Sequence, residues 1–344
     1  MASITIALDT MGGDHGLDSV IPAAFAQLKK DPQLNFILVG KQNEIEAYLK
    51  KYHFKLNSRI SICHASEVVA MDELPSQALR NKKDSSLRVA IEQIKKGNAD
   101  AMVSAGNTGA LMATARFVLK MLPGISRPAV TATIPTINNR TVSLLDVGAN
   151  VNCDAEQLLQ FALMGSIVRE TIAHVANPKV GLLNVGSEEI KGNDLVKEAA
   201  QLIQKHAEIN YTGFVEGDDI FYGDVDVVVC DGFVGNVVLK ASEGIASMIL
   251  KLIKRSFMRN SFSKFCALVA KPVLKPLAKT LNPETHNGSC LLGLKGIVVK
   301  SHGSANANAF AHAIEHAKSA VQQNLVGKIK SGLDAINQLP IKED

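Results

Sequence analysis

Five short segments rich in Gly, Asn, Ser and Thr carry most of the polar chemistry of this chain, and each follows an apolar run. They are residues 9–15 (DTMGGDH), 104–109 (SAGNTG), 184–187 (NVGS), 231–236 (DGFVGN) and 302–306 (HGSAN). Where such a segment opens a helix, its backbone N–H groups and the helix dipole favour an anion. Neutral amide and hydroxyl donors suit phosphate, because a neighbouring carboxylate would repel it. The segments therefore predict an anion site built largely from neutral donors.

Motifs that the chain lacks narrow the identity of that anion. No GxGxxG is followed by an acidic residue about twenty positions later, which disfavours a dinucleotide site. No GxxxxGK[ST] is present, which disfavours a P-loop kinase. A small phosphate or a phosphorylated substrate is therefore the favoured ligand.

Several side chains compete for the role of nucleophile or metal ligand. Cys230 ends the run DVVVC, and an acyl-cysteine with His302 as its base is one alternative. A small buried core residue is the favoured interpretation. His312 and His316 do not follow the HExxH order and fit a solvated helix face. The Asp and His residues of segment 9–15 fit backbone capping, so we assign no metal and no cofactor.

The elements that position these segments repeat one pattern, in which an apolar strand, a polar turn and a helix follow one another. Helices are expected at residues 19–29, 43–51, 154–171 and 193–206, among others. Two strands joined at Asn138–Asn139 are expected to pair antiparallel. The pattern predicts a three-layer α/β/α sandwich with a mostly parallel sheet, as one domain over residues 1–340. Ligands of such sheets bind beyond the carboxyl ends of the strands, so several of the polar segments are expected to converge at one edge.

Composition excludes several broad classes of protein. The chain has 344 residues, of which 47% are hydrophobic, so it can bury a large core. No uninterrupted apolar run reaches the 18 or so residues of a membrane-spanning helix. The start lacks the basic region of a signal peptide, and five scattered cysteines without a CxxC pair fit a reduced, cytoplasmic protein. The absence of Trp and 5% aromatic content argue against a nucleic-acid partner.

The net charge of +4 conceals an asymmetry. Residues 244–283 contain no acidic residue and eight basic ones, so the remainder carries 29 basic against 33 acidic residues, a net of −4. We expect this segment to be a basic, amphipathic helical insertion. Three roles remain open for it: a dimer interface, an anionic membrane surface and an acidic partner protein. The residues expected to make membrane or partner-protein contacts are Lys254, Arg255, Phe257, Arg259, Phe262, Lys264, Lys271 and Lys275.

The order of these motifs resembles the bacterial phosphate acyltransferase (PlsX) family of phospholipid synthesis. The resemblance is carried by IALDTMGGDHG, VSAGNTGALMA, RPA, LLDVGAN, VGLLNVGSEEIKGN, DVVVCDGFVGNVVLK and LLGLKGIVVKSHGSAN. The family is similar to phosphate acetyl- and butyryltransferases, with a fold of the isopropylmalate-dehydrogenase type. The resemblance implies transfer of a fatty acyl group from acyl carrier protein to inorganic phosphate. A membrane glycerol-3-phosphate acyltransferase would consume the product, which implies a cytoplasmic enzyme peripherally bound to the inner face of the membrane.

The residue types and the resemblance agree on roles within the polar segments. His302 is the expected proton relay, and Asn236 and Ser187 are expected to position phosphate or the thioester carbonyl. Asp231 is expected to orient its own loop or the histidine. Lys191 and Lys300 are candidates for offsetting phosphate charge, with a solvated surface or strand-end position as the alternative for both. The family pattern commonly has Asp where this chain has Asn306. This difference weakens the hypothesis that a carboxylate at this position is essential. The expected phosphate or substrate contacts are Ser104, Gly106, Asn107, Thr108, Asn184, Gly186, Gly235, Gly303, Ser304 and Asn306.

Two other functions remain open from the sequence. One is a short-chain phosphotransacylase that uses acyl-CoA, and the other is a non-catalytic module that binds acyl carrier protein or a membrane surface. The amino-acid sequences of the motifs and the basic insertion both favour the long-chain enzyme over these alternatives.

Overall fold

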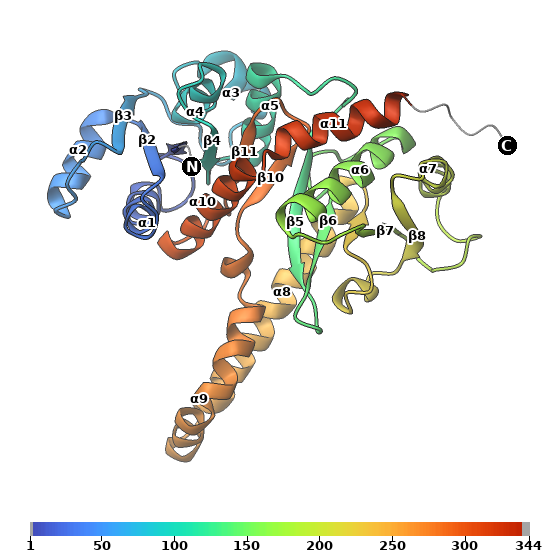
Figure 1. The fold of residues 1–344 in the computed structure, drawn as a ribbon. Coiled ribbons are helices and arrows are strands. Elements are labelled where there is room, and N and C mark those ends of the chain that lie inside the picture. The colour runs from blue at the N-terminus through green and yellow to red at the C-terminus, as the bar shows by residue number, and fades with distance from the viewer. Residues whose placement is uncertain (1–2, 339–344) are drawn as a thin grey trace.

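A computed structural model describes residues 3–338 and shows a large twisted sheet with helices on both faces (Figure 1). The strands are β1 (Ile4–Asp9), β2 (Leu34–Gly40), β3 (Ile60–His64), β4 (Ala101–Ser104), β5 (Ala129–Pro135), β6 (Thr141–Leu145), β7 (Lys179–Leu183), β8 (Asn210–Val215), β9 (Val227–Val229), β10 (Ser289–Leu292) and β11 (Ile297–Lys300). The helices are α1 (Leu17–Lys30), α2 (Gln42–Lys51), α3 (Pro75–Asn81), α4 (Ser86–Lys95), α5 (Thr108–Leu119), α6 (Ala155–Ile172), α7 (Asp194–Gln204), α8 (Gly232–Phe257), α9 (Ser261–Leu281), α10 (Ala307–Gln322) and α11 (Leu325–Gln338), with short 3₁₀ turns η1 (Asp219–Phe221) and η2 (Pro283–His286). The expected helices lie where they were predicted, within about two residues at most ends.

The eleven strands form one sheet in the order β3-β2-β1-β4-β11-β10-β5-β6-β9-β7-β8. Most neighbouring strands are parallel, as expected, but β10 runs antiparallel to both β11 and β5, and β6 runs antiparallel to β5. The predicted antiparallel pair around Asn138–Asn139 is thus β5 and β6, and the positive φ of 60° at Asn139 fits that tight turn.

The reversal at β6 divides the polar segments between the two edges of the sheet. Strands β6, β9 and β7 run opposite to β1, β4 and β11, because β5 is parallel to β11 and antiparallel to β6. Segments 9–15, 104–109 and 302–306 therefore lie at one edge of the sheet. Segments 184–187 and 231–236 lie at the opposite edge. The prediction that several segments converge at one edge is therefore confirmed for the first three, and the other two are not part of that group.

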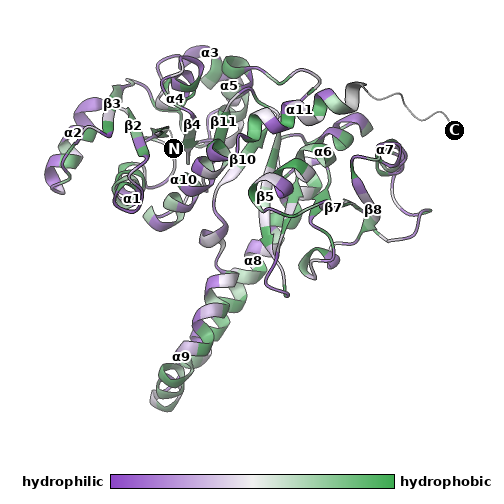
Figure 2. Ribbon diagram, in the orientation of Figure 1, coloured by the Kyte–Doolittle hydropathy of each residue, from purple (hydrophilic) through white to green (hydrophobic). Residues whose placement is uncertain are grey.

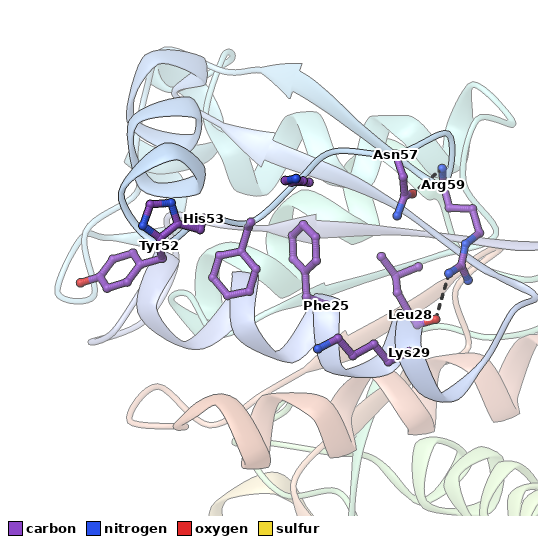
Figure 3. Close-up of a pocket in the computed structure, with 9 residues that line it drawn as sticks. Phe25, Leu28, Lys29, Tyr52, His53, Asn57 and Arg59 are labelled. Atoms are coloured by element: carbon purple, nitrogen blue, oxygen red, sulfur yellow. Dashed lines mark hydrogen bonds between the residues drawn. The ribbon is translucent and has the colours of Figure 1, made fainter.

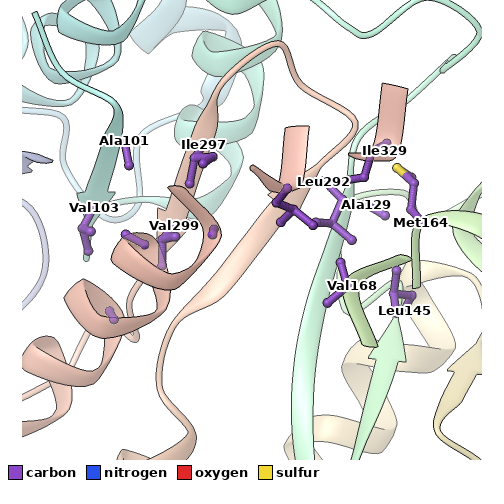
Figure 4. Packing of buried hydrophobic residues seen from close by; sticks show 14 of the residues in the cluster. Ala101, Val103, Ala129, Leu145, Met164, Val168, Leu292, Ile297, Val299 and Ile329 are labelled. Carbon is purple, nitrogen blue, oxygen red and sulfur yellow. The ribbon is translucent and has the colours of Figure 1, made fainter. Parts of the chain in front are cut away.

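Two buried layers, one on each face of the sheet, hold the fold together. Along β1, Ile6 and Leu8 pack into one layer with α1 and α10, and Ala7 between them packs into the other layer with α4 and α5. This alternation follows from the period of two along a strand. Figure 4 shows the first layer, where Val299 of β11 and Leu145 of β6 lie on the same face of the sheet.

Asparagine and aspartate side chains start six of the described α-helices. Each accepts a hydrogen bond from the backbone N–H three residues later, which satisfies a donor that the helix itself leaves open. The capping residues are Asn107 (α5), Asp154 (α6), Asn193 (α7), Asp231 (α8), Asn260 (α9) and Asn306 (α10). Some of the Asn and Asp residues of the polar segments therefore serve as helix caps.

The basic segment forms a helical hairpin of α8 and α9 that projects from the body (Figure 1). No residue of α9 is buried, and large apolar side chains such as Phe262, Leu268 and Val273 are more than 60% exposed. Figure 2 shows the apolar residues interleaved with polar ones along both helices.

Helix α8 is also long and apolar enough to cross a membrane by length and composition, with a window of mean hydropathy 1.3. Lys240 and Glu243 lie within this helix, so it contains no uninterrupted apolar run of that length and was not expected from the sequence.

Candidate active site

A cavity of about 750 Å³ lies between β5, the first half of α8, the η2 segment and the loop after β11. Six residues singled out by the sequence line it: Thr108, Asn236, Lys300, His302, Gly303 and Ser304. The cavity therefore joins three of the polar segments. Because α8 runs back along the sheet from Asp231, it carries Asn236 from the opposite edge toward the loop after β11.

His302 lies at the polar end of this cavity and is held from both sides. Its backbone N–H donates to Asn287 Oδ1 at 2.8 Å. Its Nδ1 lies 2.9 Å from Ser304 Oγ, and its Nε2 lies 3.3 Å from Lys240 Nζ. Partial desolvation of the ring and the positive charges of Lys240 and Lys300 lower the pKa of His302. These groups favour a neutral imidazole at physiological pH.

Lys300 brings a positive charge to the base of the same cavity. It is buried, and its Nζ is bonded to the carbonyl oxygens of Ala105 and Ser301. Burial, followed by the charge of Lys240, lowers its pKa to about 8, while Asp9 and Asp14 act in the opposite direction. A buried ammonium without a carboxylate bonded to it favours an incoming anion.

The walls of the cavity are apolar beside this polar end. Val130, Ala132 and Ile134 of β5 contribute one wall, and Val147 and Leu239 another. Such a pairing of an apolar wall with a few convergent polar groups is typical of small-molecule sites. An acyl chain and an anion could thus be held next to each other.

Other residues of segment 104–109 support the site from behind it. Ser104 is buried and donates to Asp9 Oδ2 at 2.6 Å, and its Oγ accepts from the Gly106 N–H. The Asn107 side chain caps α5 and donates to the carbonyl oxygens of Met71 and Glu73. The side chains of Ser104 and Asn107 therefore position the neighbouring backbone.

The remaining predicted residues do not line the cavity. Asn184 bonds within its own loop, to the Val185 N–H and the Lys191 carbonyl oxygen, and Ser187 is exposed nearby. Gly186 and Gly235 are buried, Asp231 caps α8, and Asn306 caps α10 and donates to Glu284 Oε1.

The cysteine alternative is disfavoured by the environment of Cys230. Its thiol is buried, and burial together with the carboxylates of Asp231 and Asp146 raises its pKa well above the usual value. A thiol held protonated in this way is a poor nucleophile.

Sequence reasoning missed Lys240, Glu243 and Met71, all of which line the cavity. Asn236, Lys240 and Glu243 are spaced i, i+4 and i+7, so one face of α8 presents all three. This helical spacing can be recognised in the sequence if a helix is assumed to begin at Gly232. Met71 has no such signal, because a loop brings it there and Asn107 holds that loop.

A second hollow of about 420 Å³ lies between α1 and the segment after α2, and its lining includes Phe25, Lys29 and Arg59 (Figure 3). The Arg59 guanidinium is bonded to the carbonyl oxygens of Leu28 and Asp31. None of its lining residues belongs to the polar segments, so this hollow is not the candidate site.

Comparison with known proteins places the chain in a family. The model of the family described as "Fatty acid synthesis protein" matches residues 4–328. The chain belongs to this family. A phosphate acyltransferase of Legionella pneumophila (strain Paris) is 56% identical over 339 residues, covering 98% of this chain and 99% of the relative. A phosphate acyltransferase of Alkalilimnicola ehrlichii is 55% identical over 334 residues, covering 97% of each. Membership of this family makes the chain an enzyme of the acyltransferase class.

The fold is similar to that of solved phosphotransacylases. A phosphotransacetylase from Streptococcus pyogenes matches with a TM-score of 0.60 and 18% identity, over 96% of this chain and 94% of the other. At this identity the match confirms the predicted phosphotransacylase-like α/β/α fold and says nothing further about the substrate.

Proposed function

We propose that this enzyme transfers a long-chain acyl group from acyl carrier protein to inorganic phosphate and releases acyl phosphate. The observation that carries the proposal is that one cavity brings the buried Lys300, together with His302 and Ser304, next to an apolar wall of β5. The relatives that are more than half identical to the chain are named phosphate acyltransferases, which supports acyl transfer to phosphate.

The proposed reaction needs little covalent chemistry from the protein. Phosphate is already a nucleophilic oxyanion, so the site must hold it about 3 Å from the thioester carbonyl. A phosphate oxygen forms the new bond to the carbonyl carbon, and the carbon–sulfur bond breaks, so that the electron pair leaves with the carrier thiolate. Lys300 offsets the phosphate charge. Thr108 lies at the N-terminus of α5, where the helix dipole and the open backbone N–H groups favour an anion. Asn236 and Ser304 donate to oxygens that gain negative charge.

The choice of acyl carrier protein as donor rests on the hairpin of α8 and α9. Carrier proteins of this kind are acidic, and the eight basic residues of segment 244–283 provide a complementary field close to the cavity. The exposed apolar side chains of α9 suit an anionic membrane surface or a second copy of the chain. We propose a homodimer at the cytoplasmic face of the membrane, where a glycerol-3-phosphate acyltransferase would receive the product for phosphatidic acid synthesis.

The short-chain alternative draws support from the phosphotransacetylase fold. A short-chain enzyme that uses acyl-CoA has no need for an exposed basic and apolar hairpin, so we place it second. A non-catalytic binding module is the third alternative, and the family membership argues against it.

One experiment separates these functions. Purified protein is incubated with long-chain acyl carrier protein, long-chain acyl-CoA or acetyl-CoA, with and without phosphate, and loss of thioester is followed. Phosphate-dependent loss from acyl carrier protein is expected. Preference for acetyl-CoA would support the short-chain enzyme, and no turnover of any thioester would support the binding module.

A matched pair of variants ties the activity to this cavity. Ser304→Ala is expected to lower kcat by about 10²-fold, the typical loss for one donor to a developing oxyanion. Ser126→Ala removes an exposed hydroxyl that bonds Gln160 outside the cavity, and it is expected to retain activity. Equal activity of the two variants would contradict the proposed site.

A further inference from the structure

Four polar side chains form a continuous chain from the rim of α8 into the cavity. Glu243 Oε2 lies 2.7 Å from Lys240 Nζ, which lies 3.3 Å from His302 Nε2. His302 Nδ1 in turn lies 2.9 Å from Ser304 Oγ. The chain joins residues that are 62 positions apart in sequence, so its geometry depends on where α8 crosses the loop after β11.

The chemistry of lysine sets the direction of this chain. An ammonium group has three donors and no acceptor. His302 Nε2 must therefore accept from Lys240, and the one proton of a neutral ring must reside on Nδ1. The Nδ1–H then donates to Ser304 Oγ, which leaves the hydroxyl proton of Ser304 to point to another acceptor.

We propose that Lys240 is a positioning residue that holds His302 as the neutral Nδ1–H tautomer and thereby makes Ser304 a hydrogen-bond donor toward the substrate. Its use in acyl transfer rests on the proposed function, whereas the tautomer itself does not. Ser304 is the group that would touch a phosphate oxygen, the carbonyl oxygen or the leaving sulfur. Lys240 acts on the reaction through His302 and Ser304.

One contact favours the opposite tautomer. The backbone N–H of Ser304 lies 3.4 Å from His302 Nδ1, where it would prefer a lone pair. This contact is the longest of the set and involves a neutral donor. Hydrogen bonds from charged donors are roughly twice as strong as neutral ones. The Lys240 contact therefore decides the tautomer.

The charges around the ring also favour its neutral form. Lys240 on α8 and Lys300 on β11 oppose an imidazolium, while Glu243 on α8 and Asp14 in the β1–α1 loop favour it. With its Nε2 lone pair engaged and its ring neutral, His302 is poorly placed to act as a general base. This differs from the proton relay expected from sequence, and it leaves attack to phosphate itself.

The tautomer can be measured without any substrate. Full-length protein labelled with ¹⁵N-histidine is examined by long-range ¹H–¹⁵N correlation, in which protonated and unprotonated ring nitrogens differ in chemical shift. His302→Gln assigns the signals of His302. The Nδ1–H form is expected in the wild-type protein. The Nε2–H form in the wild type would overturn the proposal.

Two substitutions in α8 move the pKa of His302 in opposite directions. Lys240→Met removes a positive charge and is expected to raise the pKa and release the tautomer preference. Glu243→Gln removes a negative charge and is expected to lower the pKa. Lys251→Met is the matched control, because Lys251 is exposed further along the same helix. An unchanged tautomer and pKa in Lys240→Met would overturn the proposal.

A double-mutant cycle links the tautomer to turnover. If Lys240 acts through Ser304, Lys240→Met lowers kcat in the wild-type background but lowers it no further in the Ser304→Ala background. Additive losses would contradict that route. If no acyl transfer to phosphate occurs at all, the proposed function fails, and the tautomer measurement still stands or falls by itself.

Discussion

The Asn107 side chain donates to the carbonyl oxygens of Met71, at 2.9 Å, and Glu73, at 2.9 Å, which precede it by more than thirty residues. Its Oδ1 also accepts from the Ala110 N–H at 3.0 Å and so caps α5. One amide thus fixes the start of a helix and the loop that brings Met71 to the cavity. A residue chosen from sequence as a phosphate ligand acts in this structure as an organiser of two backbone segments.

Asn107→Ala is therefore expected to cost more than the loss of a helix cap. A cap alone contributes about 1 kcal/mol to the free energy of unfolding, and the carbonyl oxygens of segment 70–73 would also lose their donor. Asn193→Ala is the matched control, because Asn193 caps α7 away from the cavity. Urea unfolding and acyl phosphate formation are measured for both. Equal losses of stability and activity in the two variants would contradict this role.

Two glycines of α8 are expected to respond to alanine in opposite ways. A Cβ at Gly235 would overlap the carbonyl oxygen of Asp146, which is backbone and cannot swing aside. Gly235→Ala is expected to cost about 1–3 kcal/mol, as overpacked substitutions do, and to displace Asn236. A Cβ at Gly244 meets nothing within 4 Å, so Gly244→Ala is expected to stabilise α8 by roughly 0.5–1 kcal/mol. Thermal unfolding measures both, and a stable Gly235→Ala variant would show that α8 can move away from β6.

Lys300 makes the site sensitive to alkaline pH. Burial lowers its pKa to about 8, so its positive charge is present below that pH and is lost above it. The KM for phosphate is expected to rise as the pH passes through about 8. In Lys300→Met this KM is expected to be high at every pH. Lys295→Met, which changes an exposed lysine before β11, is expected to keep the wild-type profile. A Lys300→Met variant with the wild-type profile would assign the titration to another group.

The same lowered pKa has a consequence for stability. Between about pH 8 and the ordinary lysine pKa of 10.5, the unfolded chain binds more protons at this residue than the folded chain does. The free energy of unfolding therefore gains a contribution that rises with pH in that window. Lys300→Met removes the cost of burying a charge, so it is expected to be more stable than the wild type near neutral pH. Denaturant unfolding at pH 7 and pH 9 tests the sign, and destabilisation at pH 7 would contradict it.

The sequence predicted the element types well and the assembly of the site only in part. Buried strands such as β1 are continuous apolar runs, and helix starts such as Asp154 and Asn193 have capping side chains, so local chemistry identifies them. The direction of β6 depends on how β5 pairs with β10, a contact between residues about 160 positions apart. The turn at Asn138–Asn139 predicts that β6 runs antiparallel to β5, but no local pattern shows how β5 is oriented relative to β11. The sequence therefore does not show that segments 184–187 and 231–236 lie at the edge opposite His302.

Lys240 illustrates a second limit. From the sequence it is one polar residue in an apolar helix, which usually indicates a solvated face. Its function as a partner of His302 arises because α8 extends from the opposite edge of the sheet to the loop after β11. A residue whose importance depends on such a crossing is visible only in the folded chain.

Charge reversal in α9 tests the proposed carrier-protein contact. Lys264, Lys271 and Lys275 are exposed and do not line the cavity. Replacing all three with Glu is expected to raise the KM for acyl carrier protein and to leave the KM for phosphate unchanged. The difference from wild type is expected to shrink as salt rises, because screening shortens the range of the field. An unchanged KM at low salt would place the carrier protein elsewhere.

The apolar side chains of α9 are expected to determine membrane association independently of charge. Phe262 is 76% exposed and Phe265 is 63% exposed, so neither contributes to the core of the body. Phe262→Ser with Phe265→Ser is expected to reduce sedimentation with vesicles of anionic phospholipid, because each buried side chain of this size contributes about 1.5–3 kcal/mol at an apolar interface. Substituting Phe117→Ser, which changes an exposed phenylalanine of α5, is the matched control. Size-exclusion chromatography of the same variants reports whether these side chains bury against a second copy instead. Unchanged sedimentation together with a loss of the dimer would assign the hairpin to the interface between subunits.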